Sequence, residues 1–364
     1  MTPNNDKRKK IVIALVLATI VVILSYIFNN YVFKQEPIAK NGFYFNTIIA
    51  IQLNDTTDES LIDDCFQMAN TYEHYFSRTL EDSDIYKINH ADGSPVEVHE
   101  ETAELIRYGI AFGELSDGVF DISIGALTDL WDIPNNDGTI PAQADIDAAL
   151  ATVDYRQIVV DGNTVTLKNP DAALDLGGIA KGYVADRMRE YLNAHGSDKG
   201  FINLGGNVLT LGQKANDEPY HIGIRKPFGE DGETITAVDV TDRSIVTSGR
   251  YERYFEKDGR IYHHILDPKT GYPYDNGLNG VTILSDSSMV GDALSTICFA
   301  LGQEKGTEFL SSMPSNDFLQ STLATETTIQ AIFIDENNEM TAVDCIIRIH
   351  LGEDICCCLQ IQFP

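Results

Sequence analysis

Residues 172–196 read AALDLGGIAKGYVADRMREYLNAHG, and this stretch constrains the fold more than any other. Its first six residues predict a strand, and the later residues predict a helix that ends at Gly196, because glycine readily adopts the left-handed conformation after a helix. Gly177 and Gly178 lie between the two elements and permit close approach of the backbone to a ligand. Exposed amides at a helix start bind phosphate, and Lys181 adds a positive charge there. A tight strand-to-helix turn without a ligand would use the same glycine pair.

Outside this stretch, strands and helices are interspersed without the strict alternation of a parallel α/β fold. Runs rich in β-branched residues predict strands, and apolar residues at helical spacing predict helices. The predicted strands cover 45–53, 201–212, 235–249 and 280–285, and the predicted helices cover 57–78, 99–116 and 289–302. Residues 154–167 predict a hairpin that turns at Asp161-Gly162-Asn163. We therefore expect an α+β fold, with one large domain over residues 42–343.

The N-terminal part of the chain has a separate character. Residues 1–10 end in an unbroken basic cluster, and residues 11–28 are almost entirely apolar. A helix of about 18 residues is about 27 Å long, close to the thickness of the hydrocarbon core of a bilayer. The positive-inside rule places residues 1–10 in the cytoplasm and everything after residue 28 outside it. We expect residues 11–28 to anchor the protein in the cell membrane by a single pass, followed by a tether over 29–41. A cleaved signal peptide would need small residues, which SYIFNN does not provide.

The charge balance limits the class of partner. The chain has 364 residues, with 26 Lys and Arg against 55 Asp and Glu, and its formal net charge is −29. Binding to nucleic acid depends on clustered basic residues, so this composition argues against a nucleic-acid partner. Residues 344–364 form an atypical tail that holds four of the six cysteines. Three adjacent cysteines could suggest metal binding or palmitoylation, but adjacent positions on one strand cannot all face one ion and no paired CxxC accompanies them, so we interpret the segment as an atypical tail.

Two further segments carry residues suited to phosphate chemistry. In GDALSTICFALG, residues 291–302, Asp292 and Thr296 are four apart and lie on one face of the predicted helix. A carboxylate and a hydroxyl are hard oxygen ligands of the kind that Mg²⁺ prefers, although a capping role for Asp292 would explain the pair equally well. His264 precedes the turn sequence DPKTG, and an imidazole there could act as a general base or orient a phosphate. Zinc is disfavoured because no paired cysteine or histidine spacing accompanies it.

Taken in order, these segments resemble one enzyme family. They are DLGGIAKGYVADRM (175–188), FINLGGNVLTLG (201–212), the stretch 247–273 around His264, and GDALSTICFALG (291–302). Two more stretches agree with the family pattern: YFSRTLEDSDIYKIN (75–89) and SDGVFDISIGALTDLW (116–131). Over about residues 42–340 the chain resembles the FAD:protein FMN transferases, also called the ApbE or thiamine-biosynthesis lipoprotein family.

The resemblance implies a definite chemistry. Enzymes of this family bind FAD, use Mg²⁺ and transfer FMN to a threonine or serine hydroxyl of an extracytoplasmic flavoprotein, with release of AMP. The acceptor is a protein such as a subunit of an ion-pumping redox complex. Some members hydrolyse FAD to FMN and AMP, so a Mg²⁺-dependent FAD pyrophosphatase is one alternative. A membrane-tethered protein that binds FAD without turnover is another.

Carried over residue by residue, the resemblance implies three sets of site residues. The metal ligands would be the backbone carbonyl of Gly178 and the side chains of Asp292 and Thr296. The flavin-side contacts would be Leu80, Val119, Phe120, Asp121, Asp175 and Lys181. Our candidates for the base that takes the acceptor proton are His264 and, second, Asp175. Two departures concern the flavin pocket, because Phe45 stands where the family has a methionine and Leu80 where it has a tyrosine.

Overall fold

A large antiparallel sheet forms the centre of the computed structural model, which describes residues 3–27, 36–214, 217–311, 326–348 and 357–362. Over these residues the sheet has nine strands in the order β1-β2-β6-β7-β10-β13-β14-β15-β16, and every neighbouring pair is antiparallel. The strands are β1 (Ile38–Tyr44), β2 (Thr47–Leu53), β6 (Gly200–Leu204), β7 (Asn207–Leu211), β10 (Ser244–Gly249), β13 (Leu278–Ser285), β14 (Glu326–Asp335), β15 (Met340–Arg348) and β16 (Cys357–Gln362).

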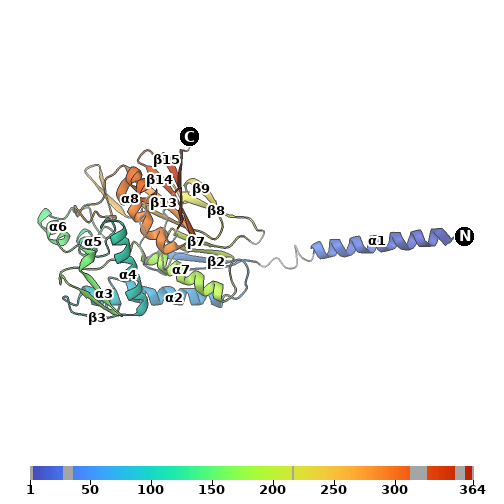
Figure 1. Ribbon diagram of the computed structural model, residues 1–364, viewed down its shortest axis with the longest axis horizontal. Coiled ribbons are helices and arrows are strands. Elements are labelled where there is room, and N and C mark those ends of the chain that lie inside the picture. The colour runs from blue at the N-terminus through green and yellow to red at the C-terminus, as the bar shows by residue number, and fades with distance from the viewer. Residues whose placement is uncertain (1–2, 28–35, 215–216, 312–325, 349–356, 363–364) are drawn as a thin grey trace.

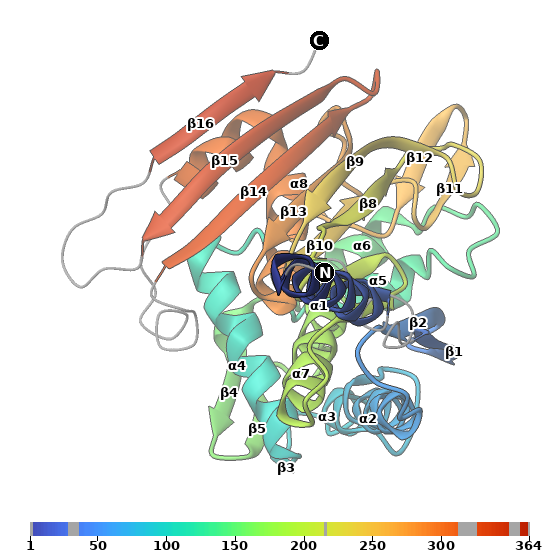
Figure 2. The same ribbon diagram turned by 90° about the vertical axis from the view of Figure 1, so that its right-hand side faces the viewer.

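Two helices pack together on one face of this sheet (Figure 2). Helix α7 (Ala180–Ala194) contacts β6 and β7, helix α8 (Ser288–Ser311) contacts β10 and β13, and the two helices contact each other. Val281 and Ile283 of β13 belong to the core beneath these helices. Leu284 points to the opposite face, where the hairpin of β8 (Tyr220–Arg225) and β9 (Thr234–Val240) covers it. Strand β13 is therefore buried on both faces.

The remaining elements lie outside the nine-stranded sheet, and Figure 1 shows α2, α3 and α4 gathered on the α7 side of the molecule. They include the hairpin of β4 and β5, which confirms the hairpin predicted within residues 154–167. Gly162, at its turn, has a φ in the left-handed region. Their bounds are α2 (Ser60–Phe76), α3 (Asp84–Asn89), β3 (Val96–Glu97), α4 (Glu100–Leu115), α5 (Gly125–Trp131), α6 (Gln143–Leu150), β4 (Ile158–Asp161), β5 (Thr164–Leu167), β11 (Tyr254–Lys257) and β12 (Arg260–His263).

The mixed strand and helix fold predicted from the sequence is confirmed, with three local differences. Residues 235–249 form two strands, β9 and β10, which belong to different sheets, instead of one strand. Residues 201–212 form the hairpin β6–β7 instead of one strand, because Gly205 and Gly206 adopt positive φ angles of 61° and 97° and turn the chain. The stretch AALDLG is not a regular strand. It pairs with residues 122–125 through an isolated bridge at Ala173 and a few backbone bonds, such as Asp175 N to Ile122 O at 2.8 Å.

The sheet begins earlier than the sequence predicts. Strand β1 starts at Ile38, so residues 38–41 belong to the sheet. The predicted end of the tether at residue 41 is therefore wrong. The reason lies at the tip of the β1–β2 hairpin. Phe45 and Asn46 have φ angles of 54° and 55°, a two-residue turn that pairs Tyr44 with Thr47. The earlier part of the expected tether, residues 29–35, lies outside the described residues.

The expected tail over 344–364 also contributes to the sheet. Residues 344–348 continue β15, which pairs with β14 from Met340 onward, and residues 357–362 form the edge strand β16. No turn signal interrupts the sequence MTAVDCIIR, so the strand extends past the predicted boundary. The tail is therefore partly sheet.

Helix α1 (Pro3–Ile27) lies apart from the folded body in Figure 1. The large apolar side chains between Val12 and Leu24 are exposed. Among the described residues, no helix combines the length and the apolar character that a membrane span requires. The anchor predicted over 11–28 is therefore not confirmed.

Candidate active site

The starts of α7 and α8 cross at close range. A β-carbon at Gly182 of α7 would be 2.3 Å from the carbonyl oxygen of Ser288, so glycine is required for the helices to approach this closely. The amide of Gly182 donates a hydrogen bond of 2.9 Å to Oδ2 of Asp292 on α8. The glycine-rich loop and the acidic helix, 110 residues apart in the chain, are thereby held together.

The three predicted metal ligands lie at this crossing. Thr296 is one turn beyond Asp292, and its hydroxyl oxygen is 3.4 Å from the Asp292 carbonyl oxygen and 3.2 Å from Oγ of Ser248 on β10. Gly178 lies beside it, since a β-carbon at Gly178 would be 3.7 Å from Thr296 Oγ1 and 3.0 Å from the ring of Phe120. The structure thus brings Gly178, Asp292 and Thr296 into one neighbourhood.

The carboxylate of Asp292 has few partners of its own. Its residue is 4% exposed, and burial raises the pKa of the carboxyl, an effect that the charge of Lys181 and the Gly182 amide only partly oppose. Within the described chain, Gly182 is the one hydrogen-bond donor found for this carboxylate. A buried carboxylate costs free energy unless charge is supplied nearby, and a carboxylate with a hydroxyl one turn away offers oxygen ligands to a cation. The donor set therefore fits Mg²⁺.

The loop before α7 uses most of its amides internally. The Ile179 and Ala180 amides donate to the carbonyl oxygen of Leu176 at 3.0 Å and 2.8 Å, and the Gly177 amide donates to Asp175. Phosphate binding by these three amides, which the sequence suggested, is therefore not favoured. The cation Lys181 lies over the same loop, with its Nζ 3.3 Å from Gly177 O.

Asp175, at the start of this loop, is well compensated. Nε of Arg78 is 3.4 Å from its Oδ2, and the Gly177 amide donates to Oδ1 at 2.8 Å. Burial alone would raise the pKa of Asp175, but Arg78 and the Gly177 amide, with the Thr128 hydroxyl and the charge of Arg253, hold it below its usual range. Asp175 is thus an anion that the protein itself neutralises.

Arg78 also joins three of the sequence motifs. Its guanidinium pairs with Asp129 of α5 as well as with Asp175. The stretches 75–89, 116–131 and 175–188 therefore meet at one side chain. These contacts place the segment after α2 beside Asp175, where the glycine-rich loop begins.

The predicted flavin contacts differ in how open they are. Asp121 accepts the Ser123 amide and hydroxyl at 2.8 Å and 2.6 Å and the Tyr155 amide at 3.0 Å. Both of its oxygens serve the protein, which favours a role in holding the loop. Phe120 is buried against Gly178, whereas Val119 and Leu80 are partly exposed. Their contacts with flavin stay predictions.

His264 has one ring nitrogen engaged. Its Nδ1 is 3.3 Å from the carbonyl oxygen of Arg253, and because a carbonyl only accepts, we assign the proton to Nδ1 and leave Nε2 as an acceptor. Burial, with the charges of His263, Arg253 and Lys181, lowers the pKa of His264 to about 3. The imidazole is therefore neutral near pH 7 and a weak base, and its Nε2 is oriented to accept a hydrogen bond.

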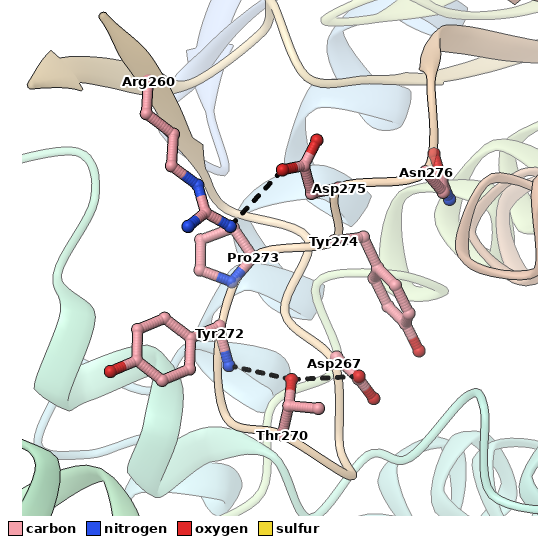
Figure 3. A pocket seen from close by; sticks show the side chains of 8 residues that line it. All are labelled: Arg260, Asp267, Thr270, Tyr272, Pro273, Tyr274, Asp275 and Asn276. Atoms are coloured by element: carbon pink, nitrogen blue, oxygen red, sulfur yellow. Dashed lines mark hydrogen bonds and ion pairs between the residues drawn. The ribbon is translucent and has the colours of Figure 1, made fainter. Parts of the chain in front are cut away.

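A hollow of about 430 Å³ lies on the segment after His264 (Figure 3). In it Asp275 is 3.4 Å from Arg260, and the Thr270 hydroxyl donates to Asp267 at 3.0 Å. Its lining residues are Arg260, Asp267, Thr270, Tyr272, Pro273, Tyr274, Asp275 and Asn276. None of the residues predicted to bind FAD or metal lines it, so we do not assign FAD to this hollow.

Sequence reasoning missed three groups at the site. Arg78 and Ser248 lie inside the quoted motifs, but their partners are distant in the chain, so no local pattern indicates them. Asp186 also lies inside a quoted motif. Its spacing of four residues from Gly182 places it on the same face of α7, but its partner Ser288 is 102 residues away, so the spacing does not indicate the contact.

Comparison with known proteins agrees with this arrangement. The ApbE family model matches residues 45–319. The FAD:protein FMN transferase of Klebsiella pneumoniae (strain 342) is 40% identical over 286 residues, which is 78% of this chain and 84% of that protein. The FAD:protein FMN transferase of Treponema pallidum (strain Nichols) is 36% identical over 274 residues, 71% of this chain and 76% of that protein. The crystal structure of the ApbE protein of Thermotoga maritima has a TM-score of 0.73 at 31% identity and covers 84% of this chain and 96% of its own. The chain therefore belongs to the ApbE family.

Proposed function

We propose that this protein is a Mg²⁺-dependent FAD:protein FMN transferase, which moves FMN from FAD to a threonine or serine hydroxyl of an extracytoplasmic flavoprotein and releases AMP. The observation that carries the proposal is the α7–α8 crossing, which gathers Gly178, Asp292 and Thr296 beside Lys181. Named relatives with this activity support the reaction class.

The metal would be held by the Asp292 carboxylate, the Thr296 hydroxyl and the Gly178 carbonyl. When bound, Mg²⁺ would neutralise negative charge on the FAD diphosphate. The chain itself contributes Lys181, whose charge lowers the pKa of both Asp292 and His264 and therefore reaches both. A local cation of this kind attracts a diphosphate despite the net charge of −29, because distant carboxylates are screened beyond about 8 Å.

The transfer step exchanges one phosphorus–oxygen bond for another. The acceptor hydroxyl oxygen bonds to the phosphorus on the FMN side of FAD, and the bond from that phosphorus to the bridging oxygen breaks. AMP leaves with the bridging oxygen and its electron pair. Nε2 of His264, whose other nitrogen is engaged with Arg253, accepts the hydrogen bond of the attacking hydroxyl and takes its proton as the new bond to phosphorus forms, when that hydroxyl becomes acidic. Asp175 is the weaker candidate for the base, because Arg78 and Gly177 already occupy its oxygens.

We also propose that residues 11–28 anchor the protein and that residues 1–10 stay in the cytoplasm, with the catalytic domain outside. The basic cluster before the apolar run and the exposed apolar side chains of α1 support this. Protease treatment of intact spheroplasts should remove the folded domain and spare the basic stub. Recovery of the full chain in the soluble fraction would contradict the anchor.

The direct test incubates the full chain with FAD, Mg²⁺ and an acceptor flavoprotein domain. The proposal predicts that chromatography detects AMP and that the mass of the acceptor increases by one FMN group. Both should be lost when the target threonine or serine of the acceptor is replaced by Ala. Release of AMP with free FMN in the absence of acceptor would indicate the pyrophosphatase instead. Intact FAD with several acceptors would contradict both and leave a non-catalytic FAD-binding protein.

A further inference from the structure

The start of α8 is capped by a carboxylate from another helix. Asp186 of α7 is 7% exposed. Its Oδ1 accepts the Ser288 amide at 2.9 Å, and its Oδ2 accepts the Met289 amide at 3.0 Å and the Ser287 hydroxyl at 2.7 Å. Arg189, one turn further along α7, donates to Oδ1 at 3.0 Å. A helix start leaves its first amides without partners, and here Asp186 supplies two of those partners.

The rest of the first turn is satisfied locally. The Val290 amide is 3.3 Å from the Ser287 hydroxyl, and the Gly291 amide donates to the Ser287 carbonyl at 3.0 Å. The position of the first turn of α8 is therefore set by Ser287 and by Asp186 together. Since Asp186 belongs to α7, it also fixes where α8 begins relative to the glycine-rich loop.

Three backbone-to-carboxylate hydrogen bonds join the two helices, one in one direction and two in the other. The Gly182 amide of α7 donates to Asp292 of α8, and the first amides of α8 donate to Asp186, one turn after Gly182. Asp292 and Thr296 follow the capped turn on the same helix. A shift of the α8 start would therefore move both side chains away from Gly178.

We propose that Asp186 is a positioning residue for the metal-binding pair Asp292 and Thr296. This inference rests on the proposed function, and it assigns to Asp186 no contact with FAD or with the ion. The carboxylate uses both oxygens for α8, because the Ser288 amide bonds to Oδ1 and the Met289 amide to Oδ2. Asparagine has one acceptor oxygen and no charge, so one α8 amide loses its acceptor, Arg189 loses its ion pair and the start of α8 is held less firmly. The metal site then loses affinity although every ligand is still present.

The chain contains a matched control. Asp55 accepts the Ser197 hydroxyl at 2.7 Å and the next two amides, Asp198 at 2.7 Å and Lys199 at 3.0 Å. Asp186 accepts the same set from Ser287 and the two residues after it. The three hydrogen bonds at Asp55 hold the connection between the end of α7 and β6. This connection is at the opposite end of α7 from the place where α7 meets α8. Asp55→Asn therefore removes the same kind of interaction at a different place.

The test compares Asp186→Asn with Asp55→Asn in the full chain. We expect Asp186→Asn to raise the Mg²⁺ concentration for half-maximal AMP release about tenfold, the lower end of the cost of losing a group that orients a metal ligand, with little change in rate at saturating Mg²⁺. Asp55→Asn should leave that concentration unchanged. Hydrogen exchange without metal or FAD should become faster over residues 286–300 in Asp186→Asn alone.

An unchanged Mg²⁺ requirement in folded Asp186→Asn, or an equal rise in Asp55→Asn, would overturn the proposal. If Asp186→Asn does not fold, Ser287→Ala removes one donor only, and it should raise the Mg²⁺ requirement by a smaller factor; no rise would count against the proposal. If the wild type releases no AMP, the proposed function fails, and the exchange comparison still decides whether Asp186 holds the start of α8.

Discussion

Asp175 and Asp292 flank the same glycine-rich loop, yet the protein compensates them differently. Asp175 faces Arg78 and the Gly177 amide, and the pKa of its carboxyl is lowered against the effect of burial. Asp292 is more buried, receives one amide, and the pKa of its carboxyl is raised. Asp175 has an ion pair with Arg78, whereas within the part of the chain that the structure describes Asp292 has the nearby charge of Lys181 and no ion pair.

This difference indicates which acidic residue serves the fold and which serves a ligand. A buried carboxylate that is paired with an arginine already has its charge balanced, and it serves to hold segments of the chain together. A buried anion with one amide and a hydroxyl one turn away is an open arrangement that a divalent cation would complete. The comparison therefore predicts that substitutions at the two places change different measurements.

The largest effect is expected for Asp292→Asn, which removes the charge and keeps the shape. AMP release should fall by at least about a hundredfold, because metal stabilisation of phosphate charge is worth several kcal/mol and each 1.4 kcal/mol is a factor of ten. AMP is measured by chromatography over a range of Mg²⁺ concentrations. An Asp292→Asn protein with wild-type rate and wild-type Mg²⁺ dependence would break the comparison.

A smaller effect is expected for Thr296→Val, which removes one hydroxyl and preserves the side-chain shape. The Mg²⁺ concentration for half-maximal rate should rise by at least about tenfold, since loss of a group that only orients a ligand already costs that much. Thr282→Val, which removes a hydroxyl bonded to Thr247 on the sheet, is the control. Equal Mg²⁺ dependence in the two variants would show that Thr296 is not a ligand.

The smallest effect concerns Arg78→Ala and is visible in the pH dependence of stability. Because the folded-state pKa of Asp175 is lowered, its carboxylate adds stability above the unfolded pKa, and this stability is lost as the pH falls through the folded pKa. Without Arg78 the folded pKa rises, so the loss should begin at a higher pH. Urea unfolding from about pH 3 to 7 measures this.

Arg156→Ala is the matched control for Arg78→Ala, because Arg156 forms an exposed pair with Asp154. Exposed ion pairs contribute little to the free energy of unfolding. The pH at which stability is lost on the acid side should therefore change less in Arg156→Ala than in Arg78→Ala. If wild type and Arg78→Ala lose stability over the same acidic pH range, Arg78 does not lower the pKa of Asp175.

Local patterns predicted much of the fold. The apolar spacing of α2, α4 and the first part of α8 is visible in the sequence, and Gly302, with a φ of 78°, interrupts α8 where the sequence placed its end. The hairpin tip at Phe45-Asn46 was missed because a two-residue turn with positive φ usually contains glycine, and this one does not. The sequence therefore predicts a tether where residues 38–41 of β1 lie.

The sequence was sufficient to predict which residues form the site, but not which of them contact one another. Spacing alone placed Asp292 and Thr296 on one helical face. The contact of Gly178 with Thr296 depends on the fold, as do the Arg78 pairs and the Asp186 cap, because each joins elements that are far apart in the chain. Charge compensation, which separates Asp175 from Asp292, is a property of those distant contacts.

Anomalous X-ray scattering from crystals soaked with Mn²⁺ and AMP tests the central claim most directly. Our account predicts a single strong peak in contact with the Asp292 carboxylate and the Thr296 hydroxyl, beside the Gly178 carbonyl, and none at Asp175. A peak on Asp175, or crystals that bind AMP with no peak between α7 and α8, would contradict it.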